Sequence, residues 1–292
     1  MQVFIGLDGG GTCCRGQAEL PDGQRTAIVS GGAANIASDF DSALHEISCT
    51  LAQVIDAVHA MVPSAAEITP RIVLGVAGAS ETDAGARLGA ALPYRALSVC
   101  GDVDISLSGA FGDSDGIVMA VGTGSVLACQ QSGQMRRLGG YGLMLGDEGS
   151  GAWIGRVALQ RCLHARDGIG ATGTLVDALD QQFPTLPEII AFARSARPAD
   201  FAALAPVVLE HDRKHCPVAG AILDDGCAYL LRGLNKLQSR THDLPVVPLG
   251  GLGPALLDRI LAKDNVHLRR VTPRGTGLDG ALWRARRGAP SV

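Results

Sequence analysis

The chain has 292 residues, of which 47% are hydrophobic and 18% charged, and its formal net charge is −4. This balance is typical of a compact globule with room for two domains, and it excludes a disordered or strongly basic nucleic-acid-binding chain. The cysteines show no Cys-x-x-Cys spacing, and the N-terminus has neither a basic leader nor a membrane-spanning apolar run. We therefore expect a reduced, cytoplasmic protein without nucleic-acid or membrane partners.

The first half of the chain predicts strands that alternate with helices. It opens with a hairpin in which strand Val3–Leu7, the turn Asp8–Thr12 and strand Cys13–Leu20 follow one another. The elements expected next are a strand at Arg25–Ser30, an amphipathic helix at Leu44–Met61 ended by Pro63, a strand at Ile72–Val76, a helix at Asp83–Leu92, a strand at Ala96–Cys100 and a helix at Val103–Ala110. This alternation indicates an α/β architecture.

A polar, turn-rich segment at Gly112–Gly116 divides the chain, and a second hairpin starts directly after it. We predict one domain over 1–111 and another over 112–292, with the terminal helix able to pack back on the first. The second half is expected to contain strands Ile117–Val121, Val126–Gln130 and Gln134–Leu138, a mostly helical stretch Ala152–Ser239, strand Pro245–Leu249, a helix through Leu256–Ile260, strand Val266–Arg270 and a helix from Gly277. Arginines 269, 270, 284, 286 and 287 are expected on the solvated surface.

A glycine-rich turn occurs in both hairpins, as Asp8-Gly9-Gly10-Gly11-Thr12 and as Gly122-Thr123-Gly124-Ser125. Glycine permits positive φ and lets backbone amides approach a ligand closely, which suits an anion such as a polyphosphate. Neither turn opens a helix, and this excludes a P-loop or a dinucleotide fingerprint. One copy alone could equally be an ordinary hairpin turn. The repetition and the acidic Asp8 favour phosphate binding.

Asp102 lies at the end of an apolar strand and the start of a helix. Phosphoryl transfer needs positioning, charge neutralisation and one carboxylate that accepts the proton of the attacking hydroxyl. Asp102 is the candidate for that base. A helix N-cap is an equally good interpretation of an aspartate at this point.

Glycines surround two adjacent acids in the segment Gly139–Gly155. Such a density of glycine costs chain entropy unless the backbone must bend sharply. A pocket wall that presents Asp147 to hydroxyl groups meets that requirement, and a solvated acidic turn is the alternative.

His211 and His215 have the spacing that places two imidazoles on one helix face, as in some zinc sites. No second group of potential ligands lies nearby in the sequence. A solvent-facing helical turn, including Cys216, is therefore the better interpretation.

Taken in order, these motifs resemble the sugar-kinase, Hsp70 and actin superfamily of ATPases. Within it they resemble the branch that holds the benzoyl-CoA-reductase-type ATPases and the N-acetylglucosamine kinases. Gly6–Thr12 and Ile117–Ser125 are similar to the two phosphate motifs, Pro248–Gly253 to the adenosine motif, and Leu145–Gly155 to a motif specific to this branch. The resemblance covers essentially the whole chain. It implies a two-domain actin-like ATPase (ribonuclease H-like) fold with duplicated βββαβαβα cores and a helical insertion in the second half.

The resemblance also implies a set of site residues and cofactors. ATP would contact Gly10, Gly11, Thr12, Gly122, Thr123, Gly124, Gly250 and Gly251, and Asp8 would hold Mg²⁺ through water. The sugar would be bound by Asn35, Asp102, Gly140, Tyr141, Gly142 and Asp147, with Asp102 as the base on its 6-hydroxyl. Animal members carry tryptophan where this chain has Tyr141, which leaves the preference for the 2-substituent open.

Three functions compete on this evidence. The first is a kinase that phosphorylates an amino sugar, N-acetylglucosamine or glucosamine, and acts as a homodimer. The second is an ATP-driven activator of an iron–sulfur dehydratase or reductase, for which Cys129 and Cys162 are the only plausible cluster ligands. The third is a sugar sensor or an actin-like assembly protein without enzymatic activity.

Overall fold

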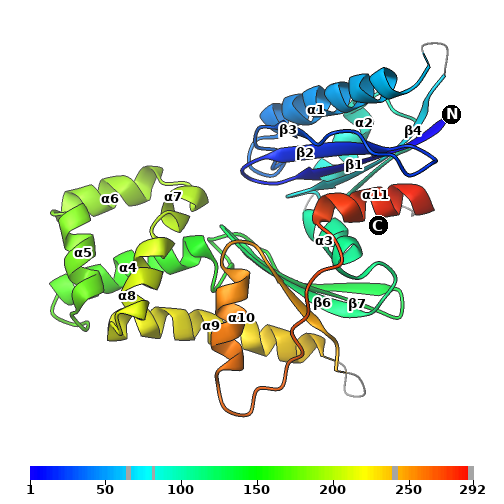
Figure 1. Cartoon of the computed structure of the whole chain (residues 1–292). Coiled ribbons are helices and arrows are strands. Elements are labelled where there is room, and N and C mark those ends of the chain that lie inside the picture. Colours follow the sequence, from blue (N-terminus) through cyan, green and yellow to red (C-terminus); the bar gives the residue numbers. More distant parts are fainter. Residues whose placement is uncertain (64–66, 81–82, 239–242, 289–292) are drawn as a thin grey trace. The chain divides into compact units, whose positions relative to one another are not determined.

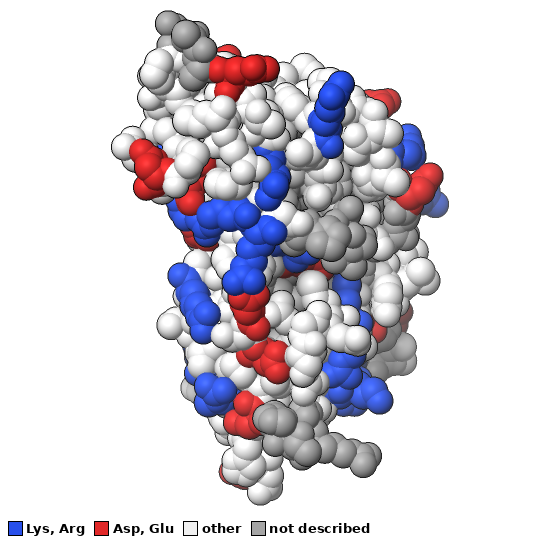
Figure 2. All heavy atoms as spheres, turned by 90° about the vertical axis from the view of Figure 1, so that its right-hand side faces the viewer, with Lys and Arg blue, Asp and Glu red and all other residues white. Residues whose placement is uncertain are grey.

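The computed structural model describes residues 1–63, 67–80, 83–238 and 243–288, which form two compact units. Unit 1 comprises Met1–Gly116, Gln130–Gln134 and the C-terminal part from Val271 onward, and unit 2 comprises Ile117–Cys129 and Met135–Arg270. Over these ranges, the helices are all too short or too polar to cross a bilayer. Basic and acidic side chains are interspersed on the face drawn in Figure 2.

The sheet of unit 1 places three strand ends at one edge. Its strands are β1 (Gln2–Gly9), β2 (Cys14–Glu19), β3 (Val29–Gly31), β4 (Thr69–Val76) and β5 (Leu97–Cys100), in the spatial order β3-β2-β1-β4-β5 (Figure 1). β1 is antiparallel to β2 but parallel to β4, and β4 is parallel to β5. The carboxyl ends of β1, β4 and β5 therefore meet at one edge, where α/β sheets commonly bind ligands.

Helices cover both faces of this sheet (Figure 1), and the side chains of β1 alternate between the two cores that they form. Val3, Ile5 and Leu7 are fully buried in the core that contains helix α1 (Phe40–Met61), beside α2 (Ala84–Ala91). Phe4 packs in the smaller core on the opposite face. Because alternate strand residues point to opposite faces, Asp8 shares the face of Phe4.

Helices α3 (Asp102–Phe111) and α11 (Gly277–Arg287) cover that second face in close contact with each other (Figure 1). A Cβ atom on Gly109 would overlap the carbonyl oxygen of Thr276, and one on Gly280 would overlap the carbonyl oxygen of Ile105. A Cβ on Gly6 of β1 would lie 2.8 Å from the backbone nitrogen of Leu282. The last helix of the chain is therefore part of unit 1.

The second sheet has the spatial order β8-β7-β6-β9. Its strands are β6 (Gly116–Val121), β7 (Ser125–Gln131), β8 (Gln134–Gly139) and β9 (Val246–Leu249), with β6 parallel to β9. The helices of unit 2 are α4 (Gly151–Arg166), α5 (Thr174–Gln182), α6 (Leu186–Ser195), α7 (Pro198–Ala202), α8 (Ala205–Arg213), α9 (Pro217–Leu237) and α10 (Gly253–Leu261). They enclose one large apolar core with the sheet.

Some expected elements differ in the structure. The strand expected at Val266–Arg270 is a single parallel bridge between Arg270 and Val246. The strand expected at Arg25–Ser30 pairs continuously only at Val29–Gly31. Arg25 forms an isolated bridge with Glu19, and the ladder is interrupted next to it because the Ala18 N–H donates to the Thr26 hydroxyl. The first long helix starts at Phe40 because Asp39 accepts a hydrogen bond from the Ser42 N–H. The expected helical end at Ser239 lies outside the described residues.

The contact between α3 and α11 predicts a stability difference between two helical glycines. Gly280→Ala should lower the free energy of unfolding by about 1–3 kcal/mol, because the new methyl group must displace backbone atoms of α3. Gly89→Ala in α2 is the control, since its Cβ would lie 3.7 Å from Val99 and in ordinary contact. That variant should be neutral or stabilising by about 1 kcal/mol. Urea denaturation of the two variants measures both changes, and equal stability would contradict this account of the contact.

Candidate functional site

Three of the expected site residues lie at the carboxyl edge of the unit 1 sheet. Asp8 is near the end of β1, Asn35 follows β3, and Asp102 begins α3 directly after β5. The loop after β4 connects the last two, because the Cβ position of Gly78 is 3.0 Å from Asn35 Oδ1 and Ser80 Oγ lies beside Gly101. The structure therefore brings Asn35 and the start of α3 to the same loop.

Asp102 is not the N-cap of its helix. Gly101 occupies the N-cap position, and its N–H donates to Asp104 Oδ2 at 2.9 Å. Asp102 is the first residue inside the helix, and its Oδ1 accepts from the Val103 N–H at 2.9 Å. The capping interpretation of Asp102 is therefore wrong, since Asp104 makes the capping contact.

Asp8 is a largely buried carboxylate between a cation and a helix start. Burial raises its pKa, and the Arg15 guanidinium, whose Nη2 is 3.3 Å from Oδ2, opposes that rise. A Cβ on Gly277, the first residue of α11, would lie 3.2 Å from Asp8 Oδ2. A desolvated carboxylate with one neighbouring cation gains from a further positive charge. These properties fit Mg²⁺, which is usually bound by one or two carboxylates together with substrate phosphates and water.

The side-chain oxygen of Asn35 accepts hydrogen bonds from the backbone of its own loop. Its Oδ1 accepts from the N–H groups of Ala37 and Ser38, at 3.0 and 3.2 Å. The side-chain NH₂ group is the donor that could reach a ligand hydroxyl.

The first glycine turn is closed by backbone hydrogen bonds. The Gly10 N–H donates to the Cys13 carbonyl, and the Ala34 N–H donates to the Gly10 carbonyl, both at 2.9 Å. Gly11 and Thr12 are exposed, and a Cβ on Gly11 would meet no atom within 4 Å. Packing inside unit 1 therefore does not explain why position 11 is glycine.

The second glycine turn, in unit 2, rests on the start of α4. The carbonyls of Gly122 and Thr123 accept from the N–H groups of Gly151 and Ala152, at 2.8 and 3.1 Å. The turn after β9 joins the same place, because the Leu252 N–H donates to the Val121 carbonyl at 3.0 Å. The two segments that resemble the phosphate and adenosine motifs are thus adjacent within unit 2.

Asp147 contacts this second turn directly. It is 7% exposed, and its Oδ1 accepts from the Ser125 N–H at 3.4 Å. The Cβ position of Gly124 is 3.0 Å from Asp147 Oδ2, so a side chain at position 124 would displace the carboxylate. Burial raises the pKa of Asp147, while hydrogen bonds from the Ser125 and Gly142 backbones oppose the rise. The candidate sugar-binding acid and the candidate phosphate turn therefore form one cluster.

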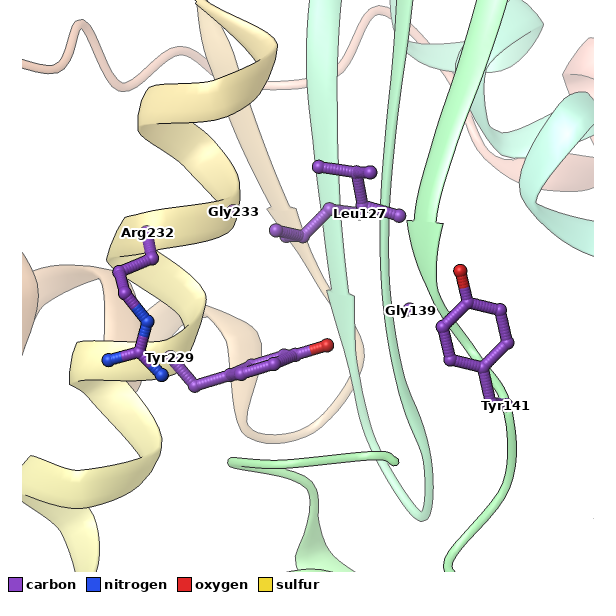
Figure 3. Close-up of a pocket in the computed structure, with 7 residues that line it drawn as sticks. Leu127, Gly139, Tyr141, Tyr229, Arg232 and Gly233 are labelled. Carbon is purple, nitrogen blue, oxygen red and sulfur yellow. The ribbon is translucent and has the colours of Figure 1, made fainter. Parts of the chain in front are cut away.

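The loop that leads to Asp147 bends through left-handed backbone. Gly139, Gly140 and Gly142 have φ values of 77°, 74° and 81°, which explains the glycine content predicted to form a pocket wall. Tyr141 between them is 65% exposed. Tyr141 and Gly139 border a cavity of about 290 Å³, and Tyr229 of α9 enters it from the other side (Figure 3). The loop thus presents an aromatic ring and backbone groups, but no cation of its own.

The histidine pair is not arranged for a metal. Helix α8 ends at Arg213, and His215 lies beyond it with φ of 60°, so the two imidazoles do not share a helix face. His211 Nδ1 is 2.9 Å from Thr174 Oγ1. Arg213, Lys214 and His215 are exposed, as expected for a solvent-facing turn, but Cys216 is buried at 5% exposure. Across the described residues, no three His, Cys, Asp or Glu side chains gather as a metal site.

Sequence reasoning missed two neighbours of Asp8. Arg15 is directly opposite Asp8 in the β1–β2 register, so a hairpin alignment could have found it. Gly277 comes from the far end of the sequence, and no local pattern connects it with Asp8. Arg284 was also misassigned: it is 7% exposed and donates to Ser108 Oγ.

Residues 5–265 match the model of the BadF/BadG/BcrA/BcrD ATPase family. The chain belongs to this family. It is 27% identical to a glucosamine kinase of Vibrio cholerae serotype O1 (97% of this chain, 95% of the relative) and 29% identical to an N-acetyl-D-glucosamine kinase of Dictyostelium discoideum (86% and 85%). A solved structure of a candidate N-acetylglucosamine kinase from Chromobacterium violaceum superposes with a TM-score of 0.86 at 32% identity, over 98% of this chain and 99% of that one. The actin-like ATPase fold and the family expected from the motifs are confirmed.

Two glycines of the ATPase motifs should respond differently to alanine. Gly250 has φ of 79° and a Cβ there would overlap the Val121 carbonyl, so Gly250→Ala should destabilise the fold by about 1–3 kcal/mol. A Cβ on Gly122 would meet no atom within 4 Å. Gly122→Ala should therefore keep the melting temperature but weaken ATP binding about tenfold or more, because the added methyl group would prevent phosphate oxygens from approaching the backbone of the turn closely. Calorimetry with ATP and thermal unfolding separate the two effects. Unchanged affinity in Gly122→Ala would contradict a phosphate site at this turn.

Proposed function

We propose that this protein is a kinase that transfers the γ-phosphoryl group of ATP to the 6-hydroxyl of N-acetylglucosamine. The observation that carries the proposal is the position of the Asp102 carboxylate. Its carboxylate stands at the ligand-binding edge of the unit 1 sheet, while Asp104 caps the helix in its place. Membership in the ATPase family and the kinase relatives support the same reaction class.

In this proposal different residues accept the proton, bind the sugar, bind ATP and hold the metal. Asp102 accepts the proton of the 6-hydroxyl as that oxygen attacks the γ-phosphorus. Asn35 donates to ring hydroxyls, and Asp147 accepts from them with the backbone of Gly140, Tyr141 and Gly142. ATP contacts the glycine turns at positions 10–12 and 122–124 and the turn at Gly250 and Gly251. A magnesium ion near Asp8 would supply charge neutralisation of the phosphates.

The activator function is disfavoured by the cysteines. An iron–sulfur cluster shared between subunits needs thiolates at an accessible surface. Cys129 and Cys162 are both 0% exposed, and burial raises the pKa of the Cys162 thiol to about 11. The Cys162 thiol donates instead to Asp180 Oδ1 at 3.2 Å. The structure thus removes the pair of ligands that this function would require.

Glucosamine is the second candidate substrate, and one observation favours it. Glu148 Oε2 is buried and, within the described residues, has no hydrogen-bond partner. Glu148 also raises the pKa of its neighbour Asp147 through charge repulsion. A substrate ammonium group would relieve both effects, and the Vibrio cholerae relative is named as a glucosamine kinase. A homodimer and a cytoplasmic location stay predictions alongside either substrate.

Replacement of the proposed base should affect turnover and leave folding intact. Asp102→Asn should lower kcat by about 10²–10⁴-fold, because the amide can still hydrogen-bond the sugar but cannot accept its proton. Asp104→Asn is the matched control on the same helix: its amide oxygen can still accept from the Gly101 N–H, so the variant should keep its stability and most of its turnover. Steady-state kinetics and thermal unfolding of both variants test this. Near-normal kcat in Asp102→Asn would exclude Asp102 as the base.

Asp8 should be needed for activity but not for stability. Burial raises its folded-state pKa, so the stabilisation it gives is complete below its unfolded pKa and is lost as the pH rises through the folded value. At pH 7 Asp8→Asn should therefore be as stable as the natural chain or more so. Its kcat should fall about 10²-fold or more, because a metal on the phosphates contributes several kcal/mol. Full activity in excess chelator, or a large stability loss in the variant, would refute this role.

The sugar preference is tested by kcat/KM for N-acetylglucosamine, glucosamine and glucose. We expect N-acetylglucosamine to be best, glucosamine next and glucose poor. A buried site that hydrogen-bonds a substituent rejects an analogue without it by up to about 10⁴–10⁵, whereas an apolar contact to the acetyl methyl contributes only about 10–200-fold. Preference for glucosamine would replace the acetyl assignment and support Glu148 as its partner. Absence of activity on all three would remove the kinase proposal.

A further inference from the structure

Unit 1 contains a cavity whose lining includes residues of α3 and α11 but neither Asp8 nor Asp102. It has a volume of about 290 Å³, at the lower end for small-molecule sites. Its wall includes Arg25 from the β2–β3 connection, Arg274 from the loop before α11, and Arg286 and Trp283 from α11. Segments far apart in the sequence thus supply three guanidinium groups to one cavity.

Glu19 holds two of these arginines together. It is 6% exposed, and its carboxylate pairs with both Arg25 and Arg286, which would otherwise repel each other. Arg274 is fixed by neutral partners, the Phe111 carbonyl at 3.0 Å and Ser114 Oγ at 2.9 Å. The guanidinium groups are therefore positioned before any ligand arrives, which lowers the entropic cost of binding.

The charges around the cavity do not balance. The lining residues Arg25, Arg274 and Arg286 carry three positive charges, against the two carboxylates Glu19 and Asp279. Both Asp279 oxygens are occupied, Oδ1 by Arg25 and Oδ2 by Thr276. Arg274 is held by uncharged partners. A formal excess of one positive charge remains.

Two donors point to the space in front of Gly112. The Cβ position of this glycine is 3.6 Å from Trp283 Nε1 and 3.7 Å from Arg274 Nη1. The indole N–H can only donate a hydrogen bond. An acceptor oxygen in this space would satisfy the indole and the guanidinium together.

We propose that this cavity binds a phosphate group, as inorganic phosphate or as the phosphate monoester of a small molecule. The excess of positive charge favours an anion, and arginine forks bind phosphate oxygens with paired hydrogen bonds. The cavity is larger than a phosphate group alone and accommodates a small organic skeleton.

The experiment titrates the full-length chain in chloride buffer with inorganic phosphate, glucosamine 6-phosphate and acetate. The active site is filled beforehand with a non-hydrolysable ATP analogue and N-acetylglucosamine, so that only a separate site is measured. Calorimetry should show saturable binding of a phosphate ligand. A Trp153→Phe background leaves Trp283 as the remaining one of the two tryptophans, and its emission should change on binding.

Matched variants locate the site. Arg274→Gln and Trp283→Phe should each weaken phosphate binding about tenfold or more, because each removes a hydrogen bond to a charged ligand. Arg287→Gln is the control: Arg287 stacks on Trp283 and pairs with Asp113, but it does not line the cavity. That variant should bind as the natural chain does. Thermal unfolding confirms that each variant is folded.

The outcomes are distinct from those for the kinase, since no turnover is measured and all of the ligand contacts lie in unit 1. Tighter binding of glucosamine 6-phosphate than of phosphate identifies a monoester, and equal binding identifies free phosphate. No saturable binding, loss of binding once the active site is filled, or equal binding of acetate would each overturn the proposal. Binding that persists unchanged in both Arg274→Gln and Trp283→Phe would do so as well.

Discussion

The backbone contact between α3 and α11 is the constraint on which unit 1 depends. Gly109 and Gly280 let the two helices approach until carbonyl oxygens fill the positions that side chains would occupy. The approach fixes how the two helices lie against each other. α3 begins at Asp102, and α11 begins at Gly277 beside Asp8. One packing contact thus positions both carboxylates assigned to the proposed phosphoryl transfer, as well as the arginine-lined cavity.

In unit 2, hydrogen bonds rather than close helix packing position the candidate site residues. The carbonyls of the Gly122–Gly124 turn accept the first N–H groups of α4, and Asp147 accepts from Ser125 just after the turn. These contacts use donors of the α4 N-terminus that would otherwise be free to bind an anion. Phosphate recognition in unit 2 would therefore rely on amides of the turn itself. The open space at Gly122 is consistent with that division.

Local patterns predicted the elements whose signals are local, and long-range pairing accounts for the failures. The paired glycine turns, the amphipathic α1 and the loop at Gly139–Gly142 were readable because periodicity and positive φ leave traces in neighbouring residues. The strand expected at Val266–Arg270 depended on pairing with β9, which is limited to one bridge. Arg284 looked like a surface residue because its partner, Ser108, is distant in the sequence. The sequence could not show whether Asp102 caps its helix, because that depends on the contact between Asp104 and the Gly101 N–H.

Unit 1 is built from the two ends of the sequence, so it cannot be completed until the last residues have been synthesised. All five strands of its sheet are complete by Cys100, yet the face with Val73 and Ile105 is covered by Ala281 and Ala285 of the last helix. A chain emerging from the ribosome N-terminus first must therefore carry an apolar sheet face that α3 covers only in part while all of unit 2 is synthesised. Unit 2 can close its own core earlier, since its residues end at Arg270. The domain that is translated first is the one that finishes folding last.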